Sequence, residues 1–483
     1  KNNSSSLSSI SLDLEKDSQK QNVSNISSVQ AENDRFTKHS PLVTLLIMSI
    51  GPLSNLVSIV FETLNMYLIS KRFNKEENSH AVEIIGFSSQ LQVLMALIGN
   101  FFGQCFVTRV SALIGSGERE RAAQLCSDLF KLPFIISIIY SILIFFVTKP
   151  FLKFVGTPSN ILNSAFKFNT FQLLFNPFSN LYTLECCFLQ SIGNSILLSI
   201  YVVVSKIIQS AILTPFFLFV CKISTTYMKL STIVVDVLFS LLMFVLVFIG
   251  KFSLKPTFRM FFTFKLSKDT LYSLLYPLPY ILLYIGNCFA PMIILRCLTS
   301  NNEEYMSQAI GGVFAIFNQV YSINQALPSA IVLAFLSTGN HAFGSNNLDR
   351  LKKLLFWALT ISISVGIIFS FSVIIFKSII ASWFVKDELE LELSSKMLPI
   401  PFYTSFLIGF GLIVYASLLI LKKPGLSMIP LLMQIAIQCA GSEIFKLIFK
   451  DSFIKIFHIY NCSDIVCFIA YLIEFIYIIR LII

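Results

Sequence analysis

Uninterrupted apolar segments constrain this chain more than any other feature. Residues 238–249 read LFSLLMFVLVFI, in which one serine is the only polar side chain. Many such segments reach the ~20 residues that a membrane-spanning helix needs. Hydrocarbon offers the backbone no hydrogen-bond partner, so a spanning chain must form helices or a closed barrel. Barrel strands alternate apolar and polar residues, whereas these segments are continuous. The sequence therefore predicts an all-α membrane protein.

The low proportion of charged residues excludes a soluble globular domain. Only 13% of the 483 residues are charged and 55% are apolar, whereas ~25% are charged in soluble domains. The net charge of +10 comes from basic residues scattered through short loops, as is usual for membrane proteins. The ten cysteines show neither CxxC pairs nor metal-ligand spacing. We therefore expect a lipid bilayer as the environment, and no nucleic-acid partner, metal or cofactor.

Twelve apolar segments are long enough to be transmembrane helices. Short loops rich in Gly, Pro, Asn and charged residues separate them. We place the spans at residues 42–70, 84–114, 126–148, 162–189, 196–221, 230–250, 273–297, 309–338, 354–376, 397–421, 425–449 and 462–483.

The chain divides into a polar tail, two lobes and a basic connection. Residues 1–40 are rich in Ser, Asn and Gln and are expected to form a disordered tail. Residues 41–250 form an N-lobe (helices 1–6), 251–272 a basic inter-lobe loop, and 273–483 a C-lobe (helices 7–12). An even number of spans places both termini on the side of this basic loop, which favours cytoplasmic termini. The expected location is the plasma membrane or an internal membrane.

The two halves of the chain repeat one another. Residues 106–121 (FVTRVSALIGSGERER) align without a gap with residues 335–350 (FLSTGNHAFGSNNLDR), each after the second span of its half. Because each half has six spans, the repeats share one orientation and are related by an axis along the membrane normal. Such lobes are typical of transporters, with a duplicated structural scaffold as the alternative. Further matches at a similar offset are Pro52 with Pro279 and Gly193 with Gly425.

Glu62 is the most informative polar residue inside a predicted span. It lies near the middle of the first span, where an ionisable group costs at least ~2.5 kcal/mol and needs a reason. Asn55, Ser58 and Asn65 share its helix face, since they recur at three- and four-residue spacing. Glu62 is the candidate ion-coupling group, through exchange of a proton or Na⁺ for a cationic solute. The alternative is that it only hydrogen-bonds helices together.

Amide side chains form further polar stripes inside the predicted spans. They are candidates for a substrate or cation cavity, with helix–helix hydrogen bonding as an equally weighted alternative. The N-lobe candidates besides Asn55 and Asn65 are Asn100, Gln104, Gln172, Asn176 and Asn180, and the C-lobe candidates are Asn287, Gln319, Gln434 and Gln438.

Other carboxylates lie inside or near the spans. Asp236 and Asp464 stand near the starts of the sixth and twelfth predicted spans, so we expect them at the membrane interface. The C-lobe is expected to hold no mid-span carboxylate comparable to Glu62. Any of these residues could form a second ion site; the others are Glu185, Glu443 and Glu474.

The chain shows no sequence pattern of an enzyme. No nucleotide-binding loop, zinc-binding helix motif or nucleophile elbow is present. The four histidines are scattered, whereas a membrane-embedded enzyme would cluster His, Asp or Cys on its loops. Aromatic residues are 14% of the chain and would suit flat organic cations through cation–π contacts.

These motifs resemble those of the multidrug and toxic compound extrusion (MATE) family. The resemblance covers roughly residues 41–483 and rests on the order and spacing of several short motifs. They are Gly51-Pro52, Glu62 ten positions after Pro52, ALIGSGERERAAQL at 112–125, LQSIGNS at 189–195, and Gly344-Ser345.

The resemblance implies a V-shaped pair of six-helix lobes and cation-coupled antiport that exports organic cations. Many members carry an Asn and, four residues later, an Asp before a Pro in span five. The matching positions here are Ser210 and Thr214, before Pro215, so the second carboxylate of that ion site is missing. This favours H⁺ coupling through Glu62 over Na⁺ coupling. Some members also use a Glu in span seven, and residues 279–296 contain none.

The sequence thus predicts a monomeric antiporter, driven by H⁺ or Na⁺, for small organic, cationic substrates. One alternative is a flippase for lipid-linked oligosaccharides from the wider superfamily. That activity would need a broad basic cavity for pyrophosphate, whereas few Lys or Arg lie inside the spans. Another alternative is a degenerate member that no longer transports.

Overall fold

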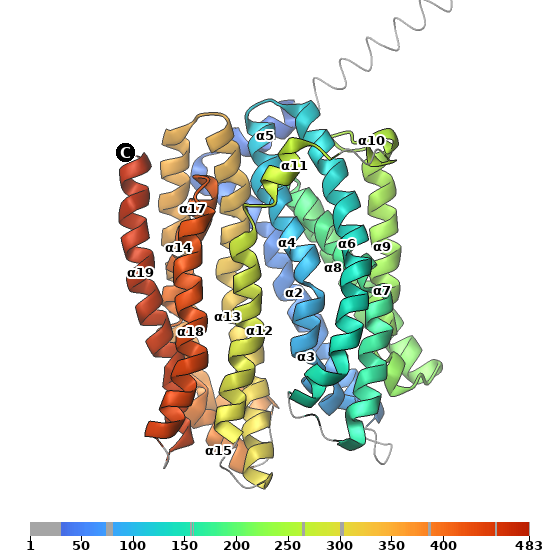
Figure 1. Cartoon of the computed structure of the whole chain (residues 1–483), viewed down its shortest axis with the longest axis vertical. Helices are drawn as coiled ribbons and strands as arrows, with labels where there is room; N and C mark the ends of the chain where they lie inside the picture. Colours follow the sequence, from blue (N-terminus) through green and yellow to red (C-terminus); the bar gives the residue numbers. More distant parts are fainter. Residues whose placement is uncertain are drawn as a thin grey trace, which may run out of the picture.

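In the computed structural model, every described element of regular secondary structure is a helix (Figure 1). The described residues are 30–73, 81–154, 157, 159–262, 266–299, 304–384, 388–449 and 452–482. Among them, ten helices are long and apolar enough to cross a membrane, or eleven if one bent pair counts as a single span. The predicted all-α membrane fold is confirmed.

The predicted N-lobe contains five of these ten helices, and two of the five are interrupted by short π-helical segments. A further helix of this part, α7, is long enough to cross a membrane but carries many polar residues. The elements are α2 (Pro41–Phe73), α3 (Ala81–Met95), α4 (Leu97–Cys105), η1 (Phe106–Val110), α5 (Ser111–Gly115), α6 (Arg119–Phe154), α7 (Ser159–Ser191), α8 (Ser195–Ile207), η2 (Ile208–Leu213), η3 (Phe216–Val220), η4 (Thr225–Tyr227) and α9 (Leu230–Phe248).

The predicted C-lobe contains the other five of the ten helices. It also contains the bent pair, in which α15 and α16 lead into α17 at an angle of 40°. The elements are α12 (Leu278–Thr299), α13 (Glu304–Gly344), α14 (Leu348–Phe384), α15 (Glu388–Met397), α16 (Pro399–Phe402), α17 (Phe406–Ile420), α18 (Pro424–Ile448), η5 (Phe453–Phe457) and α19 (His458–Ile482).

The connections at one end of the bundle are also helical. The inter-lobe loop holds two short helices, α10 (Phe258–Phe262) and α11 (Lys268–Ser273), and both lie at the end where α19 finishes (Figure 1). Residues 30–37 form a further helix before α2, and within it Glu32 and Phe36 are buried. The expectation that the disordered tail extends to residue 40 is wrong for these residues. Their buried side chains are anchored on both lobes.

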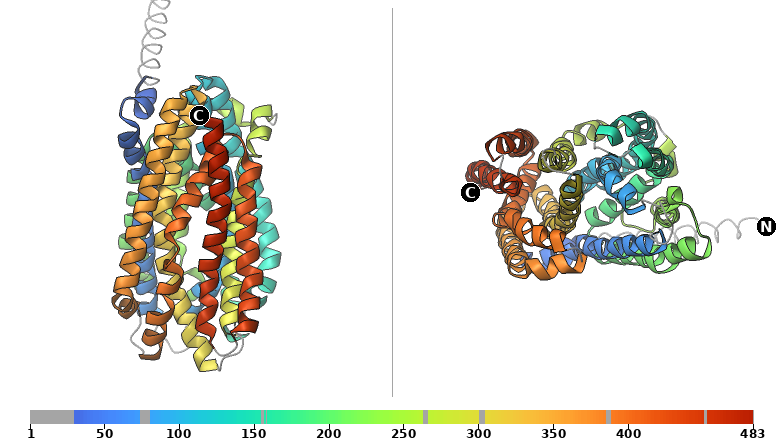
Figure 2. Two further views of the ribbon diagram at one scale, coloured as in Figure 1. Left: turned by 90° about the vertical axis from the view of Figure 1, so that its left-hand side faces the viewer. Right: turned by 90° about the horizontal axis from the view of Figure 1, so that it is seen from below.

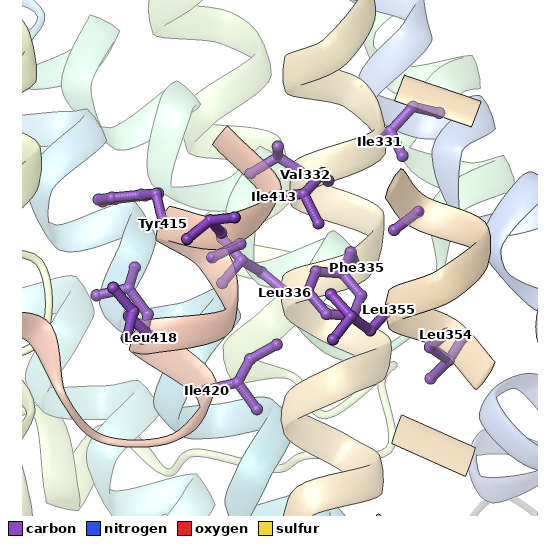
Figure 3. Close-up of a cluster of buried hydrophobic side chains, with 14 of the residues drawn as sticks. Ile331, Val332, Phe335, Leu336, Leu354, Leu355, Ile413, Tyr415, Leu418 and Ile420 are labelled. Atoms are coloured by element: carbon purple, nitrogen blue, oxygen red, sulfur yellow. The ribbon is translucent and has the colours of Figure 1, made fainter. Parts of the chain in front are cut away.

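The two lobes lie side by side, and apolar clusters fill each lobe and part of the boundary between them. Seen from below, the blue and green helices occupy one half of the bundle and the orange and red helices the other (Figure 2). In the C-lobe, α13, α14 and α17 contribute Phe335, Leu354 and Ile413 to one buried cluster (Figure 3). In the N-lobe, Phe106 and Phe188 belong to a separate cluster. Burial of this apolar surface, rather than local propensity, positions the polar residues described below.

The two repeated glycines meet where the lobes join. A Cβ at Gly115 would lie 2.2 Å from the His341 carbonyl oxygen, and a Cβ at Gly344 would lie 2.1 Å from the Ala112 carbonyl oxygen. His341 and Ala112 each stand three residues before the glycine of their own repeat. The ends of α5 and α13 therefore cross with reciprocal contacts, as a two-fold axis between the repeats requires. Only glycine allows this approach of the backbones.

The turns that follow these helices match in part. Gly117 and Asn346 stand at equivalent positions and have φ of 80° and 56°. Gly193 has a φ of 74°, but its counterpart in the second repeat is Lys422, with a φ of 59°. The predicted match of Gly193 with Gly425 is therefore wrong, because Gly425 lies within the first turn of α18. The left-handed backbone position is shared by the repeats, and the residue type is not.

Candidate functional site

Glu62 on α2 carries the most accessible carboxylate of the candidate site. Its side chain is 63% exposed, and its Oε1 lies 3.8 Å from the Nζ of Lys206 on α8, whose side chain is only 13% exposed. Lys206 lies near the middle of the span Ser195–Val220. Two opposite charges from different helices are thus brought together inside the predicted N-lobe, as the cost of an unpaired ion within a membrane requires.

Lys206 is held by a chain of hydrogen bonds that does not depend on Glu62. Its ammonium donates to Gln209 Oε1 at 3.2 Å. The Gln209 amide in turn donates to Thr232 Oγ1 on α9 at 2.9 Å. These contacts sit where α8 passes into the π-helical segment η2, a geometry that often marks functional positions.

Ser210 and Thr214 lie in the same stretch of helix and bring no charge to the site. Both side chains are buried. The Thr214 hydroxyl donates to the Gln209 carbonyl oxygen at 2.9 Å and shares a hydrogen bond of 2.8 Å with Ser231. The Ser210 hydroxyl has no partner within the described part of the chain. Their participation in ion binding stays a prediction.

Asp236 on α9 and Lys229, which directly precedes α9, extend the charge network. Asp236 accepts a hydrogen bond of 2.6 Å from Ser179 on α7. Lys229 donates to Gln92 Oε1 on α3 at 2.6 Å. Both interact electrostatically with Glu62 and Lys206. The four charged groups, together called the N-lobe charge cluster, carry no net charge when all are ionised.

The expectation that Asp236 lies at the membrane interface is wrong. Asp236 stands near the middle of the span Thr225–Phe248. The sequence analysis also missed Lys206 and Lys229, although Lys206 has the same signal that identified Glu62, an ionisable residue in mid-span. Lys229 directly precedes α9, and the sequence gives no sign that its side chain turns into the lobe.

The amide stripe on α7 bonds neighbouring helices. Asn176 donates to Ser141 at 3.2 Å, and Asn180 donates to Ser137 at 3.0 Å, both on α6. Asn180 also accepts from the backbone N–H of Gly99 on α4 at 2.9 Å. These contacts match the packing alternative for such amides.

The other N-lobe candidates differ in their surroundings. Asn55 is exposed and Asn65 is half-buried on α2. Asn100 donates to the Ala96 carbonyl oxygen of the preceding turn at 2.9 Å. Gln104 is buried, and the Gln172 amide nitrogen is buried without a partner in the described part of the chain. The arrangement brings none of these side chains into hydrogen-bond contact with Glu62.

The C-lobe candidates form two groups. Gln319 on α13 donates to Thr63 Oγ1 at 2.9 Å, which places it across the lobe boundary next to Glu62. Asn287, Gln434 and Gln438 line one small pocket between α12 and α18, together with Gly286 and apolar residues. Glu62 and the second group therefore belong to separate places in the molecule.

Asp464 on α19 is a buried carboxylate of the C-lobe. Its side chain is 6% exposed and accepts a hydrogen bond of 2.9 Å from Thr404. The same hydroxyl also lies 2.9 Å from Asn461 Oδ1. The expectation that the C-lobe has no comparable carboxylate is wrong, because Asp464 is buried within it. Asp464 lies in the second turn of α19, which begins at His458, and its placement near the membrane interface stays a prediction.

The remaining carboxylates are dispersed. Glu185 is fully buried and accepts a hydrogen bond of 2.8 Å from Tyr201. Glu474 is 9% exposed, with one oxygen unpartnered in the described part of the chain. Glu443 is exposed.

A bridging segment (residues 30–44) joins the lobes at one end of the bundle. Phe36 is 1% exposed and stacks on His341 of the C-lobe, with ring centroids 4.3 Å apart. Arg350 of the C-lobe donates to the carbonyl oxygens of Phe36 and His39 and, at 2.9 Å, to Thr44 Oγ1. This end is therefore closed by contacts that include the chain before α2.

The N-lobe holds the same end through two ion pairs. Glu32 of the bridging segment pairs with Arg119, and burial raises the pKa of the Glu32 carboxyl although Arg119 opposes that shift. In the inter-lobe loop, Asp269 accepts hydrogen bonds of 2.6 and 2.8 Å from Arg121. The Arg121 guanidinium lowers the pKa of Asp269.

Comparison with known proteins shows which family shares this sequence and arrangement. The MatE family profile matches residues 53–216 and 304–440, more than half of the chain. The probable multidrug resistance protein YoeA of Bacillus subtilis (strain 168) is 22% identical over 317 residues, covering 63% of this chain and 65% of that protein. The chain thus matches less than two thirds of the length of that relative.

Solved structures share the fold over nearly the whole chain. A MOP superfamily transporter from Pyrococcus furiosus, reported to have a binding pocket of reverse polarity, superposes with a TM-score of 0.81 and 14% identity, covering 94% of this chain and 98% of that one. An outward-facing multidrug resistance MATE family transporter gives a TM-score of 0.80 and 14% identity over the same shares. The profile match and the shared fold show that this chain belongs to the MatE family.

Proposed function

We propose that the protein is a secondary active antiporter that exports small organic cations, driven by H⁺ or Na⁺, with Glu62 as the coupling group. The observation that carries the proposal is an exposed carboxylate inside a membrane span, 3.8 Å from a largely buried lysine. A carboxylate that exchanges a cationic solute for a coupling ion is the simplest coupling device at such a position. Membership of the MatE family and the name of the Bacillus subtilis relative support export of drugs or metabolites.

The contacts between the lobes support alternating access. The end of the bundle that holds the bridging segment is joined by Arg350, Phe36 and the glycine crossing. Opening that end requires these contacts to break while others form at the opposite end. On this proposal the protein lies in the plasma membrane or an internal membrane, its closed end faces the cytoplasm, and it acts as a monomer.

The flippase alternative is less well supported by the site. Recognition of pyrophosphate needs an excess of positive charge. Lys206 and Lys229 supply two positive charges, but Glu62 and Asp236 stand in the same cluster and balance them. A loss of transport altogether, as in a degenerate member, is an outcome that the following experiment detects.

Transport in proteoliposomes tests the coupling role. Efflux of a fluorescent organic cation is measured with the proton and sodium gradients collapsed separately. For Glu62→Gln we expect loss of the gradient-driven component, by about tenfold or more, while Glu62→Asp keeps part of it. Gradient-driven export that persists in Glu62→Gln would show that the coupling group lies elsewhere, and no export by the unchanged protein would favour the degenerate member.

A further inference from the structure

The pair of Glu62 and Lys206 is asymmetric. The glutamate side chain is 63% exposed, whereas the lysine side chain is 13% exposed. A cation that reaches the site from outside therefore approaches Glu62 from the side that the lysine does not cover. The carboxylate has an accessible face for a ligand and a protected face toward Lys206.

The contact between the two groups is loose. At 3.8 Å the Nζ and Oε1 atoms attract each other electrostatically, but the distance exceeds that of a direct hydrogen bond. The directional contact of the Lys206 ammonium is instead to Gln209, at 3.2 Å. The lysine is thus positioned by its own helix and can remain in place when Glu62 takes another partner.

The neighbouring charges keep the site neutral without an external ion. Lys229 and Asp236 both interact electrostatically with Glu62 and Lys206. Their hydrogen-bond partners are the neutral side chains of Gln92 on α3 and Ser179 on α7. Two ammonium groups balance two carboxylates. The ionised Glu62 therefore needs no additional cation when the site is empty of substrate.

We propose that Lys206 is a tethered counter-ion for Glu62, which neutralises the carboxylate between transport cycles and competes with the cationic substrate for it. The proposal rests on the proposed export of organic cations through Glu62. Competition by a resident ammonium weakens substrate binding and so helps release, since transport requires binding that is strong enough for entry and weak enough for exit. The Lys206 ammonium occupies the position beside Glu62 that a bound inorganic cation would otherwise take, and so affects which cations bind there.

Binding of tetraphenylphosphonium to the purified full-length protein tests this role. For Lys206→Gln we expect a Kd about tenfold lower than that of the unchanged protein, together with slower efflux, because the competitor is gone and release becomes difficult. Lys206→Arg should restore both values. Lys396→Gln is a matched control, because Lys396 is an exposed lysine paired with Glu392 in the C-lobe. A Kd that is unchanged or higher in Lys206→Gln would overturn the proposal.

The double variant separates competition from an indirect structural effect. Without the Glu62 carboxylate the lysine has nothing to compete for. The Kd of Glu62→Gln/Lys206→Gln should therefore equal that of Glu62→Gln, whereas an additive change would contradict the proposal. If Glu62→Gln abolishes gradient-driven export and Lys206→Gln leaves the Kd unchanged, the tethered counter-ion fails while the proposed function stands. Gradient-driven export by Glu62→Gln defeats both.

A measurement on the unchanged protein keeps the test independent of variant folding. With Lys206 as the resident counter-ion, replacing Na⁺ by K⁺ should leave the tetraphenylphosphonium Kd unaltered at constant ionic strength. A Kd that rises with Na⁺ would show that an inorganic cation reaches the carboxylate in place of the lysine, and would overturn the proposal.

Discussion

The two lobes share a frame but differ in how the charged side chains within them are compensated. In the N-lobe, Glu62 and Asp236 stand with Lys206 and Lys229. In the C-lobe, Asp464 is buried and accepts a hydrogen bond from the Thr404 hydroxyl, and no Lys or Arg acts on it among the described residues. Lysines thus balance Glu62 and Asp236, whereas Asp464, like Glu185 of the N-lobe, has a hydroxyl donor as its partner.

This difference shows which residues of the repeat are fixed by packing and which charged residues can differ between the lobes. The crossing of Gly115 and Gly344 needs the same backbone approach in both repeats, so both keep glycine. The charged residues lie on helices that tolerate other side chains, provided that each buried charge is compensated. The C-lobe thus has a buried carboxylate in Asp464, and no Lys or Arg of the described residues acts on it.

The largest expected effect concerns the shared frame. Gly115→Leu and Gly344→Leu should each destabilise the protein by more than about 3 kcal/mol, because the new side chain meets a backbone carbonyl of the other lobe. The measurement is the fraction of folded protein on size-exclusion chromatography in detergent. Gly425→Ala, where a Cβ has open space, is the control and should change stability by less than about 0.5 kcal/mol. Equal behaviour of all three variants would disprove the crossing.

The next effect contrasts two aspartates, half-buried Asp236 and buried Asp464. Asp236→Asn leaves two ammonium groups against one carboxylate and should cost about 1–2 kcal/mol. Asp464→Asn retains an oxygen for the Thr404 hydroxyl and removes no ion pair, so its cost should stay below about 1 kcal/mol. Thermal midpoints in detergent report the difference. A larger loss for Asp464→Asn would mean that the C-lobe carboxylate has an undetected cationic partner.

A smaller effect is expected at the closed end, where both lobes hold the bridging segment. Arg119→Ala leaves the buried Glu32 without its ion-pair partner, and Arg350→Ala removes donors to Phe36, His39 and Thr44. Each change should weaken attachment of residues 30–44 by about 1–2 kcal/mol. Faster amide hydrogen exchange in this segment is the readout. Unchanged protection in both variants would show that the segment does not depend on the arginines.

The smallest effect is the pH dependence of the inter-lobe loop. Arg121 lowers the pKa of Asp269, so the stabilisation is present above the ordinary aspartate range and is lost as the pH falls through the lowered value. Because Arg121 is half exposed, the effect should not exceed about 1 kcal/mol. The protection factors of the α11 amides, which correct for the intrinsic pH dependence of exchange, should fall below about pH 4 in the unchanged protein, and Asp269→Asn should show the lower protection already at neutral pH. Protection factors independent of pH would contradict this.

Glu62 and Asp236 illustrate what could be predicted of the site. Glu62 was identified because a charge in the middle of a span is costly wherever the helix packs. Asp236 was misplaced because helix ends cannot be located to within a turn from an apolar pattern. Gln319 was a candidate on polarity alone, and only the fold places it against Thr63 beside Glu62.

By itself, the sequence determined the all-helical membrane fold, because backbone hydrogen bonding in hydrocarbon leaves few solutions for apolar segments of this length. It also determined the duplication, because the crossing requires a glycine at the equivalent position of both repeats, Gly115 and Gly344. The tertiary structure alone decided that Lys206 faces Glu62, that residues 30–37 form a helix between the lobes, and that Asp464 is buried. These are contacts between segments far apart in the chain, and their geometry depends on how the helices pack.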